Sequence, residues 1–70
     1  MRNQEILYYA DIYPVGQEYQ SVKLTWASGL NIIELHLFLK EIEEQFDEPV
    51  FVKLYSVVNH EVIESKEYIL

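Results

Sequence analysis

The chain has 70 residues and a formal net charge of −7, because twelve Asp and Glu residues outnumber five Lys and Arg residues. Its length is about half that of a typical domain, so we expect a single domain over residues 1–70. A hydrophobic fraction of 50% excludes a disordered acidic tail, and the lack of cysteine excludes a disulfide framework or a thiolate metal site. The negative charge argues against direct binding of nucleic acid, because direct binders are basic.

The first part of the chain has the composition of a β-hairpin. Residues Glu5 to Tyr13 are rich in Ile, Leu and Tyr and end at Pro14, which is typical of a strand. After a turn at 15–18, residues Tyr19 to Ala27 alternate with a period of two, which predicts a half-buried second strand. Ser28-Gly29 breaks that pattern. The side chains predicted to share one side of the second strand are Val22, Leu24 and Trp26.

An amphipathic helix is predicted next. Asn31 is a favourable N-cap residue, and Glu34 stands three residues later, as in a capping box. Pro49 marks the limit of the helix, because the residue before a proline avoids helical geometry. Apolar residues recur at spacings of three and four, as on one face of a helix. They are Ile32, Leu35, Leu39, Ile42 and Phe46, with Phe38 beside them.

A second hairpin follows the helix. Val50 to Val58 and Glu61 to Ile69 read as strands, with Asn59-His60 as the turn between them. The element order β-β-α-β-β predicts an α+β fold in which an antiparallel sheet packs with one helix.

Apolar residues lie on both faces of the predicted strands, which one helix cannot cover. One face of the first strand carries Tyr8 and Ile12, and the other carries Tyr9 and Tyr13. Strands buried on both sides need two covers. We therefore expect a homodimer that encloses a shared core, while a monomer with scattered exposed apolar residues is the alternative. The helix carries a second apolar set that points the same way, namely Leu30, Ile33 and Leu37.

The sequence offers little for catalysis. It has no glycine-rich phosphate loop and no nucleophile elbow, and His36 and His60 are its only imidazoles. We interpret His36 as a surface residue of the helix and His60 as a turn residue. We therefore expect a protein that is not an enzyme and that uses no metal and no cofactor.

Targeting signals are also lacking. One basic residue precedes a short, broken apolar run at the start, unlike a signal peptide, and no apolar stretch reaches the ~20 residues that span a bilayer. We expect a cytoplasmic protein without membrane contact.

The charge pattern is the most informative feature. Five acids fall in the predicted last turns of the helix, where carboxylates oppose the helix dipole and each costs about 0.3–1 kcal/mol when exposed. Like charges also stand three and four residues apart. This run of acids either binds a basic partner or is a solvated, solubilising end of the helix. Its members are Glu41, Glu43, Glu44, Asp47 and Glu48, and further acids are Glu61, Glu64 and Glu67 on the last hairpin and Asp11 and Glu18 on the first.

A row of helix carboxylates can imitate a nucleic-acid strand. Neighbouring helix positions have Cβ atoms about 5–6 Å apart, near the spacing of successive phosphates. Such a surface presents to a DNA-binding protein the field that it expects from a duplex. Tyrosines among the acids can add apolar contact and hydroxyl hydrogen bonds.

In size, charge and element order the sequence resembles the small acidic bacteriophage proteins that act as DNA mimics. It is most similar to the phage inhibitors of the bacterial histone-like protein HU, which are small acidic homodimers of helices and antiparallel sheet. It is less similar to the phage inhibitors of uracil-DNA glycosylase, whose helix opening is like Gly29-Leu30-Asn31 here but which end in fewer strands. The resemblance includes no residue-level motif, so it transfers no functional residue.

These observations predict an inhibitor that occupies the basic DNA-binding surface of a host DNA-binding protein, with HU favoured. The ten acids named above are the expected contact residues. One alternative is an interaction module that does not mimic DNA, such as an antitoxin or adaptor that docks through its sheet edge or an aromatic patch. The other is a DNA-mimic inhibitor of uracil-DNA glycosylase or another DNA enzyme.

Overall fold

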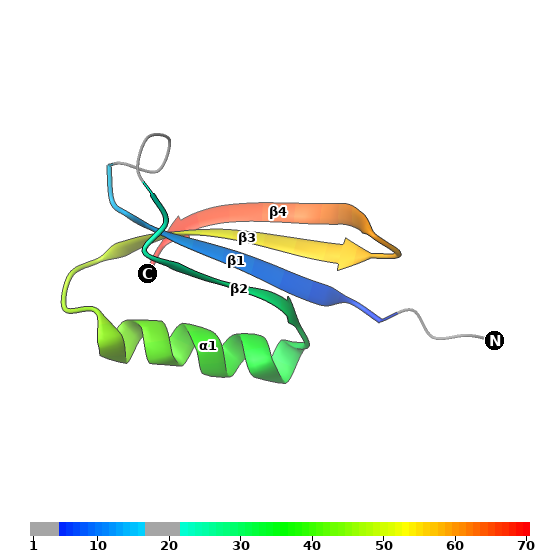
Figure 1. The fold of residues 1–70 in the computed structure, drawn as a ribbon, viewed down its shortest axis with the longest axis horizontal. Coiled ribbons are helices and arrows are strands. Elements are labelled where there is room, and N and C mark those ends of the chain that lie inside the picture. The colour runs from blue at the N-terminus through cyan, green and yellow to red at the C-terminus, as the bar shows by residue number, and fades with distance from the viewer. Residues whose placement is uncertain (1–4, 17–21) are drawn as a thin grey trace.

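The computed structural model describes residues 5–16 and 22–70. Within them, one helix and four strands follow each other in the order β1, β2, α1, β3, β4 (Figure 1). The strands form one antiparallel sheet in the order β2-β1-β3-β4, which confirms the predicted α+β fold. The bounds are Leu7–Pro14 for β1, Thr25–Leu30 for β2, Ile32–Gln45 for α1, Val50–Val58 for β3 and Glu61–Ile69 for β4.

The helix begins with the predicted capping box. The Asn31 Oδ1 atom accepts from the Glu34 backbone N–H at 2.8 Å, and the Asn31 N–H donates to Glu34 Oε1 at 2.9 Å. The helix ends at Gln45, and Phe46 caps it in an extended conformation, so Asp47 and Glu48 lie beyond it. No helix in the described ranges is both long and apolar enough to cross a membrane.

The second hairpin has its predicted bounds, and its turn explains its tight closure. Asn59 and His60 have φ values of 52° and 68°, and Val58 pairs directly with Glu61. Positive φ at both central residues is the requirement of a type I′ turn, whose twist matches that of the strands. Asn and His tolerate this left-handed conformation better than most residues.

The second strand differs from its prediction. The structure places it at Thr25–Leu30, later than the predicted Tyr19 to Ala27, of which 19–21 lie outside the described residues. Ser28-Gly29 does not end the strand, because the pairing with β1 shifts register between Tyr8 and Ala10. Gly29 has a φ of 67°, which glycine adopts at no steric cost, and so the strand continues through this irregularity.

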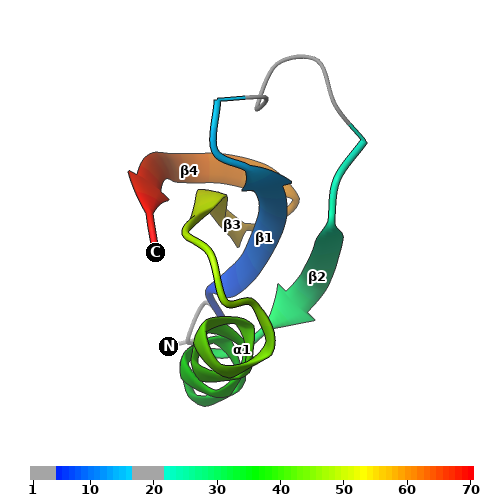
Figure 2. The same ribbon diagram turned by 90° about the vertical axis from the view of Figure 1, so that its left-hand side faces the viewer.

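The core lies between the helix and one face of the sheet. Figure 2 shows α1 beneath β1 and β2, with β4 at the edge of the sheet away from the helix. Ile12 of β1, Val52 of β3 and Ile42 of the helix are almost fully buried and contact one another. Ile12 and Val52 are register partners, so they point to the same side of the sheet.

The opposite face of the sheet has no helix over it within the described chain. By strand alternation this face carries Tyr9 and Tyr13 of β1 together with their register partners Tyr55 and Phe51 of β3. The prediction that one helix covers only one apolar face is thus confirmed. We call this surface the open face.

Candidate functional site

The five carboxylates of the helix end lie together on the surface. Glu41, Glu43 and Glu44 are on the last turns of α1, and Asp47 and Glu48 are on the segment that leads to β3. We call these five residues the acidic end. All five are exposed, the last helical turn contains no basic residue, and none of them forms an ion pair within the part of the chain that the structure describes.

An apolar stripe runs into the acidic end along the same side of the helix. Ile33 and Leu37 are 68% and 59% exposed. Glu41 and Glu44 follow at spacings of four and three, so these four side chains lie on one side of α1. Ile33 and Leu37 therefore add exposed apolar surface next to the carboxylates.

The acidic end also borders an open groove. This groove has a volume of about 770 Å³ and lies where the helix end meets the first hairpin. Asp47 and Glu48 line it together with the apolar side chains of Val15, Leu24 and Phe46. A partner side chain with a long aliphatic stem and a cationic head, such as Lys or Arg, would find apolar contact and a counter-charge here.

The negative charge of Glu43 affects the pKa of a neighbouring tyrosine, Tyr68. Tyr68 of β4 packs against the core cluster that contains Ile42. Burial raises the pKa of the Tyr68 hydroxyl above its usual value, and the negative charge of Glu43 raises it further. The acidic end is therefore close enough to the core to affect a half-buried group electrostatically.

The remaining predicted contact residues are not brought to the acidic end. Glu61, Glu64 and Glu67 are exposed on β4, and Glu64 lines a small hollow with Ile32 and Leu35 at the opposite end of the helix. Glu67 is the register partner of Lys53, which places it on the open face. Asp11 accepts a charged hydrogen bond from Lys23 Nζ at 3.3 Å, and Glu18 lies outside the described residues.

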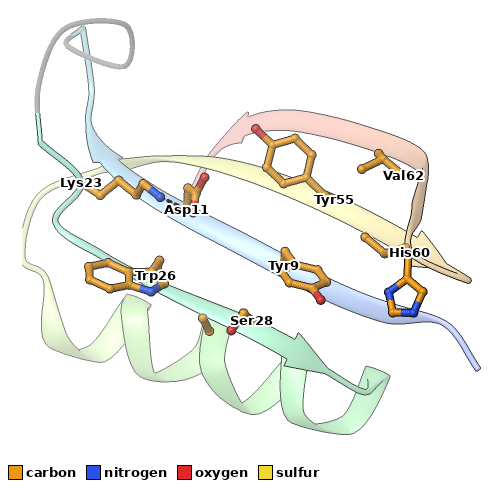
Figure 3. Close-up of a pocket in the computed structure, with 10 residues that line it drawn as sticks. Tyr9, Asp11, Lys23, Trp26, Ser28, Tyr55, His60 and Val62 are labelled. Carbon is orange, nitrogen blue, oxygen red and sulfur yellow. Dashed lines mark hydrogen bonds and ion pairs between the residues drawn. The ribbon is translucent and has the colours of Figure 1, made fainter.

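A second candidate site lies on the open face, where no pattern in the sequence predicted one. A hollow of about 520 Å³ is lined by aromatic residues from three strands, namely Tyr9, Trp26 and Tyr55 (Figure 3). Trp26 is 63% exposed, and Lys23 Nζ lies 5.6 Å from the centre of its ring. Because these residues are far apart in the sequence, only the strand pairing brings them together.

The histidines do not form a recognisable catalytic group. His36 is exposed on the helix. His60 lines the hollow on the open face, as does Asp11, but Asp11 points toward Lys23 in Figure 3 and His60 lies at the far end of the hollow. Within residues 5–16 and 22–70 no group of three or more His, Asp or Glu side chains is arranged to hold a metal ion.

Comparison of the chain with protein-family models, with curated proteins and with solved structures finds no match.

Proposed function

We propose that this chain is an acidic inhibitor that binds the cationic DNA-binding surface of another protein and thereby excludes DNA. The observation that carries the proposal is the acidic end, five exposed carboxylates without ion pairs among the described residues, beside exposed apolar side chains. The favoured target is the histone-like protein HU of a bacterial host.

The local energetics support a binding role for these carboxylates. Glu43 and Glu44 oppose the helix dipole from the last turn of α1, and each exposed carboxylate there costs about 0.3–1 kcal/mol of stability. Glu41 and Glu44 also repel each other, because they are three residues apart on one helix side. A partner with Lys and Arg side chains at this surface would relieve both costs.

The proposed mechanism requires no chemistry by the chain. The net charge of −7 speeds encounter with a basic surface by electrostatic steering. On contact, the carboxylates pair with the cationic groups that otherwise bind phosphates, and Ile33 and Leu37 add apolar contact. Since salt screens such interactions, the affinity should fall as ionic strength rises.

The test is displacement of a fluorescently labelled DNA duplex from purified HU, followed by anisotropy across a salt series. We expect the chain to displace the duplex, and we expect its affinity for HU, measured without DNA, to fall at least about tenfold between 50 and 200 mM salt. Binding to HU that does not change with salt would contradict the charge-based mechanism, and the absence of displacement would contradict HU as the target.

A second candidate function is an adaptor or antitoxin that binds its partner through aromatic residues. The aromatic hollow around Trp26 favours it. The two functions separate by mutation, because replacement of Trp26 by Ser would then weaken partner binding far more than neutralisation of the acidic end.

A further inference from the structure

We propose that the open face is the interface of a homodimer, in which two copies of this chain pack their sheets together. The face is formed by the outward side chains of the four strands, with Trp26 of β2, Tyr9 of β1 and Val62 of β4 exposed on it. Contact between copies of the chain does not depend on the proposed inhibitor function, whereas it would cover the aromatic hollow that the second candidate function uses.

The apolar side chains of the open face form a contiguous surface. Within the described residues, six hydrophobic residues are buried, whereas twelve large hydrophobic ones are exposed. Tyr9, Trp26 and Val62 line one continuous hollow, so they are not scattered single residues. Contiguous exposed apolar surface of this kind marks an interaction site in soluble proteins.

The charge on the open face permits a second copy to be its occupant. Two chains of charge −7 repel each other, so they can associate only through a surface that carries little net charge. Strand register places Asp11, Lys53 and Glu67 on the open face, and Lys23 pairs there with Asp11. Two carboxylates and two lysines cancel, which makes the open face neutral.

The two lysines are also held against the face. Lys23 Nζ lies 5.6 Å from the centre of the Trp26 ring, and Lys53 Nζ lies 5.1 Å from the centre of the Tyr13 ring. Their aliphatic stems therefore extend the apolar surface. The acidic end lies on the opposite side of the sheet, where it does not oppose its counterpart in the second copy.

The area of the open face follows from strand geometry. Four strands about 4.8 Å apart, with about eight residues rising 3.3 Å each, give a flat area of roughly 500 Å². Protruding aromatic side chains raise the accessible area above this figure. Specific interfaces take upward of about 600 Å² from each partner, so the open face is near the lower end of that range.

The dimer would place both helices on its outer surfaces. Because α1 packs on the other side of the sheet, two chains joined at their open faces expose two acidic ends, one on each side (Figures 1 and 2). Such a particle would offer two sites for a basic partner.

The test uses sedimentation equilibrium of the full chain from roughly 1 to 100 µM, together with its fluorescence. We expect a mass of about 17 kDa at the high end, twice the 8.4 kDa of one chain. Trp26 is the only tryptophan, so its emission reports on this face alone. On dilution the emission should shift to longer wavelength and acrylamide should quench it more strongly.

Two matched substitutions locate the interface. Trp26→Ser should give a monomer, whereas Leu37→Ser, which removes an equally exposed apolar side chain from the helix, should leave the dimer intact. Val62→Glu adds charge to the open face and should also give a monomer. Circular dichroism verifies that each variant is folded.

A mass of 8.4 kDa at every concentration would overturn the proposal. A dimer that survives both Trp26→Ser and Val62→Glu, or one that Leu37→Ser abolishes, would overturn the choice of face. Emission from Trp26 that does not change on dissociation would do the same.

Discussion

The helix side and the open face of this molecule differ in charge and in the kind of side chain that they expose to solvent. On the helix side, carboxylates crowd the end of α1, whose last turn contains no basic residue. On the open face, Lys23 neutralises Asp11 and aromatic side chains line a hollow. Charges that the chain pairs internally serve its own structure, whereas charges left unpaired at a local cost are available to a partner.

The two sides of the helix differ in burial, and substitution of a core residue should show this difference most strongly. Ile42 is 2% exposed, whereas Leu37 is 59% exposed. We expect Ile42→Ala to lower the free energy of unfolding by about 2–5 kcal/mol, because it leaves a cavity in the core. Leu37→Ala should change it by less than about 0.5 kcal/mol, as expected for a surface position. Urea unfolding followed by circular dichroism measures both, and equal losses would contradict the assigned packing of the helix.

The helix N-terminus is the next test, because it is stabilised where the C-terminus is not. The Asn31 side chain accepts from the Glu34 N–H at 2.8 Å. Removal of this cap by Asn31→Ala should lower the free energy of unfolding by about 1 kcal/mol, within the usual range of 0.5–2 kcal/mol. A variant as stable as the unmodified chain in the same urea titration would show that the cap contributes nothing.

The same substitution at the two helix ends should have opposite signs. Glu34 is in the first turn and favours the helix dipole, whereas Glu44 is in the last turn and opposes it. We expect Glu34→Gln to lower and Glu44→Gln to raise the free energy of unfolding, each by about 0.3–1 kcal/mol at low salt. High salt should shrink both effects, and destabilisation by Glu44→Gln would contradict the proposed cost of the acidic end.

The smallest expected effect is a pH dependence at Tyr68. Its pKa is raised in the folded state by burial and by Glu43, so the folded state favours the neutral hydroxyl. The resulting stability is present below the ordinary tyrosine pKa of about 10 and is lost as pH rises through the folded value. As pH rises above about 10, the free energy of unfolding should fall more steeply for the unmodified chain than for Tyr68→Phe. The same dependence on pH in both proteins would contradict the raised pKa.

Local signals allowed the helix and the second hairpin to be predicted from the sequence. Asn31 and Glu34 mark the helix start, and Asn59-His60 is a turn between two β-branched runs. The second strand was misplaced because Gly29 normally interrupts a strand, and only the register shift opposite β1 allows it to continue.

Of the two candidate sites, one could be predicted from the sequence and the other could not. The acidic end is contiguous in sequence and could be predicted, although the helix stops at Gln45, earlier than Pro49 indicated. The hollow on the open face could not, because Tyr9, Trp26 and Tyr55 come from three strands whose order the sequence does not state. The pairing of Asp11 with Lys23 depends on the same strand order.

Two triple variants of equal charge, compared in the HU displacement assay, test whether the acidic end is the binding surface. One variant carries Glu41→Gln, Glu44→Gln and Glu48→Gln in the acidic end, and the other carries Glu61→Gln, Glu64→Gln and Glu67→Gln on β4. Exposed charge pairs contribute about 0.2–1 kcal/mol each, and 1.4 kcal/mol is a tenfold change, so the first variant should displace DNA roughly tenfold less well. We expect the β4 variant to lose less than about threefold in displacement. Equal losses in the two variants would show that only net charge matters. Full displacement of DNA by the variant changed in the acidic end would contradict the acidic end as the binding surface.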